Sequence, residues 1–213
     1  MLIVAKTKPQ EVLSKKIYIF CEGAKTEPSY LKSYIEHRAR GKSKVISVEN
    51  TKKNTPVQLV DEAIAKKKSK ESTDGDVFWV VYDRESVSKY PREKHKQAYD
   101  KAIRHGINVA ISNVCFEFWI ILHFEKTTQP YSSYDDLYKN SPLREHLKKI
   151  NITKYEKGDS DLYYKLRDGV DCAKKRAKAI NKQVAEASQI GSEIYDYSPY
   201  TNIHELLDEI DRF

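Results

Sequence analysis

The sequence is short of features that would place it in several large classes of protein. Its longest unbroken apolar stretch, 77–82, is far below the roughly 18 residues that a membrane-spanning helix needs, so we expect no membrane span. It has 3 cysteines, Cys21, Cys115 and Cys172, which are widely spaced and form no C-x-x-C pair. This pattern argues against a disulfide framework and a zinc site and favours a reducing, cytoplasmic compartment. The opening segment MLIVAKTKPQ has no basic region before its apolar residues, so we expect no secretory signal.

The composition indicates a folded, basic protein. Only 39% of the 213 residues are hydrophobic and 32% are charged, but 15 Tyr, 6 Phe and 2 Trp argue against disorder, because disordered chains are poor in aromatic residues. Lysine and arginine (38) outnumber aspartate and glutamate (31), which gives a net charge of +7. This balance favours a polyanionic partner, although a solvated lysine-rich face produces the same sum.

The first half of the chain alternates between strand and helix patterns. Short apolar runs predict strands at 17–21, 77–82 and 107–112, and an alternating pattern predicts another at 44–49. Helical spacing of apolar residues predicts helices between them at 26–41, 56–68 and 92–105. This order predicts an α/β fold with a mainly parallel four-stranded sheet flanked by helices.

The second half reads differently. Residues 115–125 are apolar at nearly every position, which favours a buried helix. From about residue 132 onward the pattern is helical and no strand is evident, with helices expected at 143–150, 161–184 and from about 203. We therefore predict an α/β core at 1–125 and a helical C-terminal portion at 126–213 that packs on it.

Acidic residues follow two of the predicted strands. Glu22 comes directly after the first strand, and Asp83-Arg84-Glu85 comes directly after the third. Ligands of open parallel sheets bind beyond the carboxyl ends of the strands. If the two strands are neighbours, the carboxylates of Glu22, Asp83 and Glu85 converge there, and their mutual repulsion calls for a cation with hard oxygen ligands, Mg²⁺ or Mn²⁺.

A single acid after a strand is more often a helix cap or a loop residue. The neighbours of Glu22 favour the functional interpretation. Gly23 permits close approach of a phosphate, Lys25 adds a positive charge and Thr26 adds a hydroxyl, all at the start of a predicted helix whose free amides attract anions.

Four segments of the sequence resemble the signature regions of the RloB family, which belongs to the Toprim superfamily. They are CEGAKTEPSYL (21–31), VFWVVYDRES (77–86), ISNVCFEFWIILHFE (111–125) and SPYTNIHELL (198–207). The resemblance covers nearly the whole chain. It implies a Toprim-like α/β core, divalent metal at the acidic cluster, and a nuclease role in prokaryotic defence against phage, of which abortive infection is one form.

The resemblance also implies roles for individual residues. The glutamate after the first Toprim strand, which matches Glu22, performs general acid/base work, and a D-x-D after the third strand holds metal. This chain departs from the pattern because it has Asp83-Arg84-Glu85. Glutamate is one methylene longer than aspartate, so a metal held by Asp83 and Glu85 would have altered geometry.

The segment 111–125 carries further polar candidates. Asn113 is assigned to substrate binding. Glu117 is either a further metal ligand of the cluster or a buried acid that pairs with an arginine. For His123, whose neighbours are core types, a hydrogen-bonded core histidine is favoured over a ligand.

As a nuclease, the protein would also need groups that hold the substrate. Lys25 would stabilise charge developing on the phosphorus, and Arg167, Lys174 and Lys175 would contact the nucleic-acid backbone, with Tyr163 and Tyr164 available for stacking. Basic residues at helical spacing are more often a solvated face.

Two other classes of function stay open. One is a non-catalytic Toprim-like module that regulates an ATPase partner, since the family resemblance implies such a pairing. The other is a metal-dependent phosphotransferase or a binder of a nucleotide signal, which would need a smaller, closed pocket. The sequence decides neither the type of nucleic acid nor whether the protein forms a homo-oligomer.

Overall fold

The computed structural model describes residues 14–51, 55–86 and 88–213, so the segment 1–10 that we examined for a secretory signal lies outside the described residues. Within them, a five-stranded sheet has the order β2-β1-β3-β4-β5. The first four strands are parallel, and β5 runs antiparallel to β4. The strands are β1 (Ile17–Cys21), β2 (Ile46–Glu49), β3 (Val77–Asp83), β4 (Asn108–Asn113) and β5 (Tyr200–Thr201).

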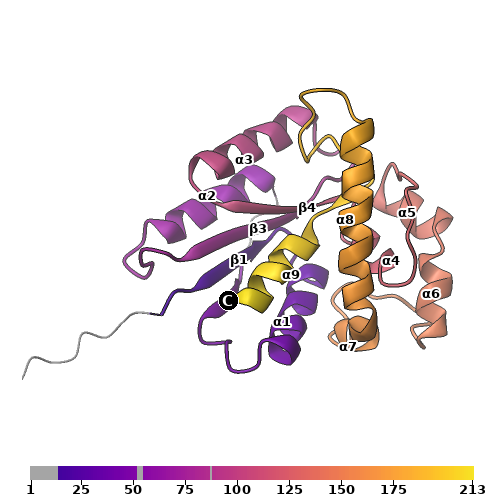
Figure 1. The fold of residues 1–213 in the computed structure, drawn as a ribbon, viewed down its shortest axis with the longest axis horizontal. Coiled ribbons are helices and arrows are strands. Elements are labelled where there is room, and N and C mark those ends of the chain that lie inside the picture. The colour runs from indigo at the N-terminus through magenta and orange to yellow at the C-terminus, as the bar shows by residue number, and fades with distance from the viewer. Residues whose placement is uncertain (1–13, 52–54, 87) are drawn as a thin grey trace, which may run out of the picture.

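Helices cover both faces of the sheet (Figure 1). Alternate residues of β1 point to opposite faces, so Ile17 and Ile19 belong to one core and Tyr18 and Phe20 to the other. The first core includes α1 (Thr26–Arg38), α8 (Val170–Ala187) and α9 (Ile203–Arg212), and the second includes α2 (Pro56–Lys67) and α3 (Arg92–Arg104). The predicted α/β class is confirmed.

Local signals account for these helices. Thr55 caps α2 by accepting the backbone N–H of Gln58, and Pro56 occupies the first helical position, as the sequence predicted. Gly106 follows α3 with a positive φ of 62°, a conformation that favours glycine. The first helix begins at Thr26, and Lys25 stands at its N-cap without a side-chain hydrogen bond.

The sequence predicted four strands, and the fifth is the main correction. β5 lies in the portion where we expected only helices, and it pairs with the end of β4. A two-residue strand shows no alternation that a pattern could reveal. Because β5 joins the sheet and α9 joins the first core, the part after residue 125 contributes to the α/β core as well as packing on it.

The other helices of this part are short. The apolar run 115–125, predicted as one helix, forms α4 only over Glu117–Ile121 and continues as turns, although Phe118 to Leu122 are fully buried. The remaining elements are α5 (Tyr134–Asn140), α6 (Leu143–Lys149), α7 (Leu162–Leu166) and a 3-10 turn at Arg167–Gly169 before α8. Among the described residues, none of the helices has the length and apolar character that crossing a membrane requires.

Candidate functional site

The two acidic segments singled out in the sequence meet at one edge of the sheet. β1 and β3 are neighbours, with Cys21 paired to Val81, so both strands end at the same rim. Glu22 follows β1 and Asp83 is the last residue of β3. The backbone N–H of Asp83 donates to Oε2 of Glu22 at 3.3 Å. The chain therefore brings together two carboxylates that are 61 positions apart.

A pocket of about 520 Å³ lies beyond this rim. We call it the acidic pocket, because five carboxylates line it. Three lysines face them, and loop and aromatic residues complete the wall. The lining residues are Glu22, Gly23, Ala24, Lys25, Thr26, Glu27, Asp83, Glu85, Lys89, Tyr90, Phe116, Glu117 and Lys157.

Glu27 is the acid that sequence reasoning missed. It lies in the first turn of α1, where a carboxylate ordinarily complements the helix dipole, so its pattern gave no reason to place it in a site. Its side chain is buried (7% exposed) and its carboxylate lies directly against Gly23. A Cβ on residue 23 would overlap that carboxylate, so Gly23 makes room for the Glu27 side chain.

Glu117 enters the pocket from α4 and is also buried (1% exposed). The hydroxyl of Tyr155 donates to its Oε1 at 3.0 Å, and Nζ of Lys157 lies 3.9 Å from the same oxygen. Lys157 in turn lies 4.1 Å from the centroid of the Tyr134 ring. Of the two sequence interpretations, the structure places Glu117 among the other acids, and its basic neighbour is a lysine rather than an arginine.

Glu85 is held at the rim by a neighbour on its own loop. Its Oε1 accepts from Nζ of Lys89 at 2.6 Å, and its backbone has a positive φ of 56°. Such a conformation is unusual for a residue other than glycine and is concentrated at functional sites. The Lys89 side chain is 56% exposed, so it can leave Glu85 for solvent and another cation can take its place on the carboxylate.

The carboxylates perturb one another. Burial raises the pKa of Glu22 to about 7, against its ordinary value of 4.5, and the charges of Glu85 and Glu27 add to the rise. Burial also raises the pKa of Asp83 and of Glu27, with the other carboxylates acting in the same direction. Although burial opposes the charge of Lys157, the carboxylates of Glu117 and Asp83 raise its pKa. The acidic pocket thus crowds five carboxyl groups beside three lysines, and this crowding favours the protonated form of the buried acids unless a cation is present.

The chemistry of the site suits a hard divalent cation, but the present arrangement of the side chains is not a finished metal site. Carboxylate oxygens are the ligands that Mg²⁺ prefers. Over the described residues, however, no three His, Cys, Asp or Glu side chains come together so that they could hold a metal ion as they stand. Glu85 is turned to Lys89, and Glu22 to a backbone amide. A cation would have to draw these two carboxylates away from their present partners.

One polar group in the acidic pocket lacks a hydrogen bond. The Thr26 hydroxyl is buried (4% exposed) and has no hydrogen-bond partner among the described residues. Its polar neighbour is the Tyr155 hydroxyl, which donates to Glu117: burial raises the pKa of Tyr155, and the nearby Thr26 hydroxyl acts to lower it. An unpaired buried hydroxyl is unfavourable, and a ligand bound in the pocket would give it a partner.

Other residues predicted for the site lie elsewhere. Asn113 lines a neighbouring pocket, where its Nδ2 donates to the backbone oxygen of Tyr197 at 2.7 Å. Lys174 is buried (7% exposed) and its Nζ bonds Asp211 at 2.6 Å and Asp208 at 3.0 Å, which makes it an internal ion pair between α8 and α9 rather than a substrate contact. Arg167 and Lys175 are exposed and do not line the acidic pocket.

His123 is a core histidine, as the sequence favoured. Its Nδ1 donates to the carbonyl oxygen of Trp119 at 3.0 Å, which leaves Nε2 to accept from the Tyr30 hydroxyl at 2.9 Å. Burial lowers its pKa to about 4, so the ring stays neutral. Both ring nitrogens are therefore committed to the interior.

The fold and site define an α/β protein whose mainly parallel sheet carries a carboxylate-lined pocket at the carboxyl ends of its first and third strands. The family model described as RloB-like protein matches residues 17–210, which includes every strand and the whole acidic pocket. The chain belongs to the RloB-like family. No curated protein and no solved structure gives a significant match.

Proposed function

We propose that this protein is a divalent-metal-dependent nuclease that hydrolyses phosphodiester bonds at the acidic pocket. The observation that carries the proposal is the convergence of Glu22 and Asp83, from separate strands, on a pocket that also contains Glu27, Glu85 and Glu117. A cluster of buried carboxylates is costly without a cation, so a functional reason for keeping it is called for. We take the sheet to be Toprim-like because the resemblance to the RloB family implies that fold.

Glu22, Asp83 and Glu85 would hold Mg²⁺ or Mn²⁺, with Glu117 as a further ligand. When bound, the metal supplies charge neutralisation for the phosphate and a water of lowered pKa. The chain's own groups would do the remaining work. Lys25, at the N-cap of α1, would stabilise the charge that develops on the non-bridging oxygens. The phosphate would lie beside Gly23, where backbone amides of the first turn of α1 and the Thr26 hydroxyl would donate hydrogen bonds to it.

Glu22 has the properties of a general base. Its pKa of about 7 means that near neutral pH it exists in both protonation states, which is what a group needs in order to take a proton from water and release it again. This role requires that Glu22 not be fully committed to the metal. Asp83 and Glu85 would then carry most of the metal binding.

The test is a cleavage assay with purified protein. Labelled RNA, DNA and tRNA are incubated with Mg²⁺, Mn²⁺ or EDTA, and the assay is repeated with Glu22→Gln and Asp83→Asn. We expect metal-dependent cleavage that each substitution reduces by at least about 10²-fold. Glu186→Gln, a change in an exposed glutamate of α8, is the matched control. Cleavage that survives both site substitutions would remove this assignment.

A second candidate is a non-catalytic module that regulates an ATPase partner. It is favoured by the finding that, among the described residues, no three ligands stand ready for a metal. If folded protein cleaves nothing under any of these conditions, the cleavage assay is repeated with the ATPase added. Activity that appears only then would assign the ATPase an activating role, and continued inactivity would favour the non-catalytic module. We place either activity in the cytoplasm and in prokaryotic anti-phage defence.

A further inference from the structure

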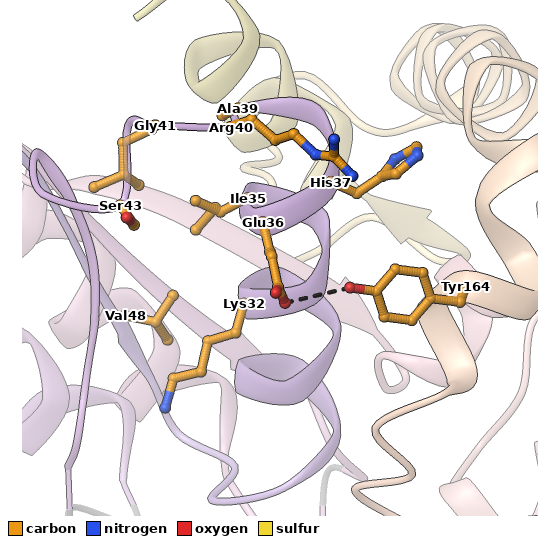
Figure 2. A pocket seen from close by; sticks show the side chains of 11 residues that line it. Lys32, Ile35, Glu36, His37, Ala39, Arg40, Gly41, Ser43, Val48 and Tyr164 are labelled. Atoms are coloured by element: carbon orange, nitrogen blue, oxygen red, sulfur yellow. Dashed lines mark hydrogen bonds between the residues drawn. The ribbon is translucent and has the colours of Figure 1, made fainter.

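A second pocket, of about 640 Å³, lies on the outer side of α1 (Figure 2). It is bounded by the second half of α1, the turn after it, the edge strand β2 and Tyr164 of α7. Its apolar residues are Ile35, Ala39, Ile46 and Val48, and its polar and remaining residues are Lys32, Glu36, His37, Arg40, Gly41, Ser43 and Tyr164. We call it the basic pocket.

Tyr164 gives the basic pocket an aromatic wall. Its side chain is one of few large apolar groups exposed among the described residues (39% exposed). Its hydroxyl donates to Oε2 of Glu36 at 3.2 Å, as Figure 2 shows, and the rings of His37 and Tyr163 approach it edge-on. The ring is thus held in place and partly open to solvent. Tyr163 is buried, so of the two tyrosines predicted for stacking only Tyr164 is available.

The charge of the basic pocket favours an anion. Lys32 and Arg40 are exposed, and neither forms an ion pair within the part of the chain that the structure describes. Glu36 is the one acid of the lining, and its carboxylate is engaged by the Tyr164 hydroxyl. Figure 2 shows Arg40 and Lys32 on opposite sides of the level of Tyr164, with the Lys32 side chain extending away from the ring. An aromatic ring flanked by unpaired cations matches a nucleotide within a strand, whose base is flat and apolar on its faces and which has a phosphate on either side.

The basic pocket and the acidic pocket both lie against α1. Lys25 lines the acidic pocket and Lys32 lines the basic pocket. Seven residues separate them, which is about 10 Å along a helix axis, and both side chains are exposed. A nucleic-acid strand lying on this face of α1 would place one nucleotide on Tyr164 and a phosphate a short distance along the strand in the acidic pocket.

We propose that the basic pocket binds a nucleotide of a single-stranded nucleic acid, with its base on Tyr164 and its phosphates on Lys32 and Arg40, and that α1 guides the same strand into the acidic pocket. The second clause rests on the nuclease function proposed above. The strand is single because the bases of a duplex are stacked on one another and cannot lie on a tyrosine ring.

The first experiment measures binding of fluorescent single-stranded RNA and DNA by anisotropy, without metal. Tyr164→Ala is expected to weaken binding at least about fivefold, while Tyr164→Phe, which keeps the ring, should retain most of the affinity. The double variant Lys32→Ala, Arg40→Ala should reduce the slope of log K against log salt by about 1.4, because each phosphate contact on a single strand contributes about 0.7. Lys68→Ala, Lys70→Ala, beyond α2 on the opposite face, is the matched control.

The outcomes separate this proposal from the nuclease assignment. If Glu22→Gln abolishes cleavage but the Tyr164 and lysine–arginine variants bind oligonucleotides like the parent, the basic pocket is not the strand site and the nuclease assignment stands. If no condition gives cleavage but the affinity for oligonucleotides falls in these variants, the strand-binding role of the basic pocket is supported without the nuclease function. Equal affinity for a free mononucleotide and for an oligonucleotide would refute the proposal that the basic pocket binds a strand. Tighter binding of duplex than of single strand would refute it as well.

Discussion

Replacing Glu22 by glutamine should stabilise the protein, and more so at alkaline pH. The pKa of Glu22 in the folded protein lies above its ordinary value of 4.5, so the folded protein holds this proton more tightly than the unfolded chain does. The free energy of unfolding that depends on Glu22 therefore falls as the pH rises from about 4.5 to about 7. Glutamine is never charged, so the Glu22→Gln protein escapes this loss.

The magnitude follows from the size of the shift. A change from 4.5 to about 7 corresponds to about 3 kcal/mol once both states are ionised, at about pH 8, and to about 1 kcal/mol at about pH 5. The amide oxygen of glutamine can still accept the backbone N–H of Asp83, so little is lost in exchange. We expect Glu22→Gln to raise the free energy of unfolding by about 2–3 kcal/mol at about pH 8 and by about 1 kcal/mol or less at about pH 5.

The assay is urea unfolding followed by circular dichroism, without divalent ions, at both pH values. Because parent and variant are compared at each pH, the titration of the histidines cancels. Glu186→Gln on the exposed face of α8 should change the free energy of unfolding by no more than about 0.5 kcal/mol at either pH. An effect of Glu22→Gln that is equal at the two pH values, or destabilising at the higher one, would refute the reasoning that this carboxylate is buried among like charges.

Three further predictions concern other parts of the molecule. Lys174→Ala should lower the free energy of unfolding by about 1–2 kcal/mol, because it leaves Asp211 with only the hydrogen bond from Tyr34 while Asp208 keeps Lys178, and oligonucleotide affinity should stay at the parent value; reduced affinity in a stable variant would support Lys174 as a substrate contact. Gly23→Ala should displace the Glu27 carboxylate and weaken Mn²⁺ binding, measured by calorimetry, while the chain stays folded; unchanged binding would show that Glu27 does not shape the site. Burial lowers the pKa of His95, His123 and His204 to about 4, so each of them should cost stability as the pH drops from about 6.5 to about 4, while the buried acids act the other way; the stability advantage of the parent over His204→Asn, measured by denaturant unfolding, should therefore narrow across this range, and a difference that does not change with pH would contradict it.

The pattern of the sequence predicted most of the α/β core, because β1, β3 and β4 lie in short apolar runs bounded by polar residues and β2 alternates between apolar and polar residues. The sequences of β1 and β3 do not reveal that the two strands are neighbours, because the strand order depends on how the crossover helices pack. From the sequence we could predict only that the carboxylates of Glu22, Asp83 and Glu85 converge if the two strands are neighbours. β5 could not be predicted, because two residues form no recognisable pattern. The end of α4 could not be predicted either, because residues 115–123 are buried without interruption.

The acidic pocket could be predicted as far as its residues follow strand ends. Glu27 has the position of an ordinary first-turn helix acid, and only its burial against Gly23 distinguishes it. Lys157 comes from a loop in the C-terminal part, so no local signal connects it with Glu117. The ion pairs of Lys174 could not be predicted, because a basic run at helical spacing does not show which residue faces Asp208 and Asp211 on α9.

The most direct test of a metal-dependent acidic pocket is a crystal structure with Mn²⁺, in which the anomalous signal locates the ion. We predict an anomalous peak in the acidic pocket, with carboxylate oxygens of Asp83 and Glu85 at about 2.0–2.6 Å from the ion and with Lys89 no longer bonded to Glu85. A fully occupied ion bound elsewhere on the protein, with Glu85 still paired to Lys89 and the pocket holding only water, would contradict it.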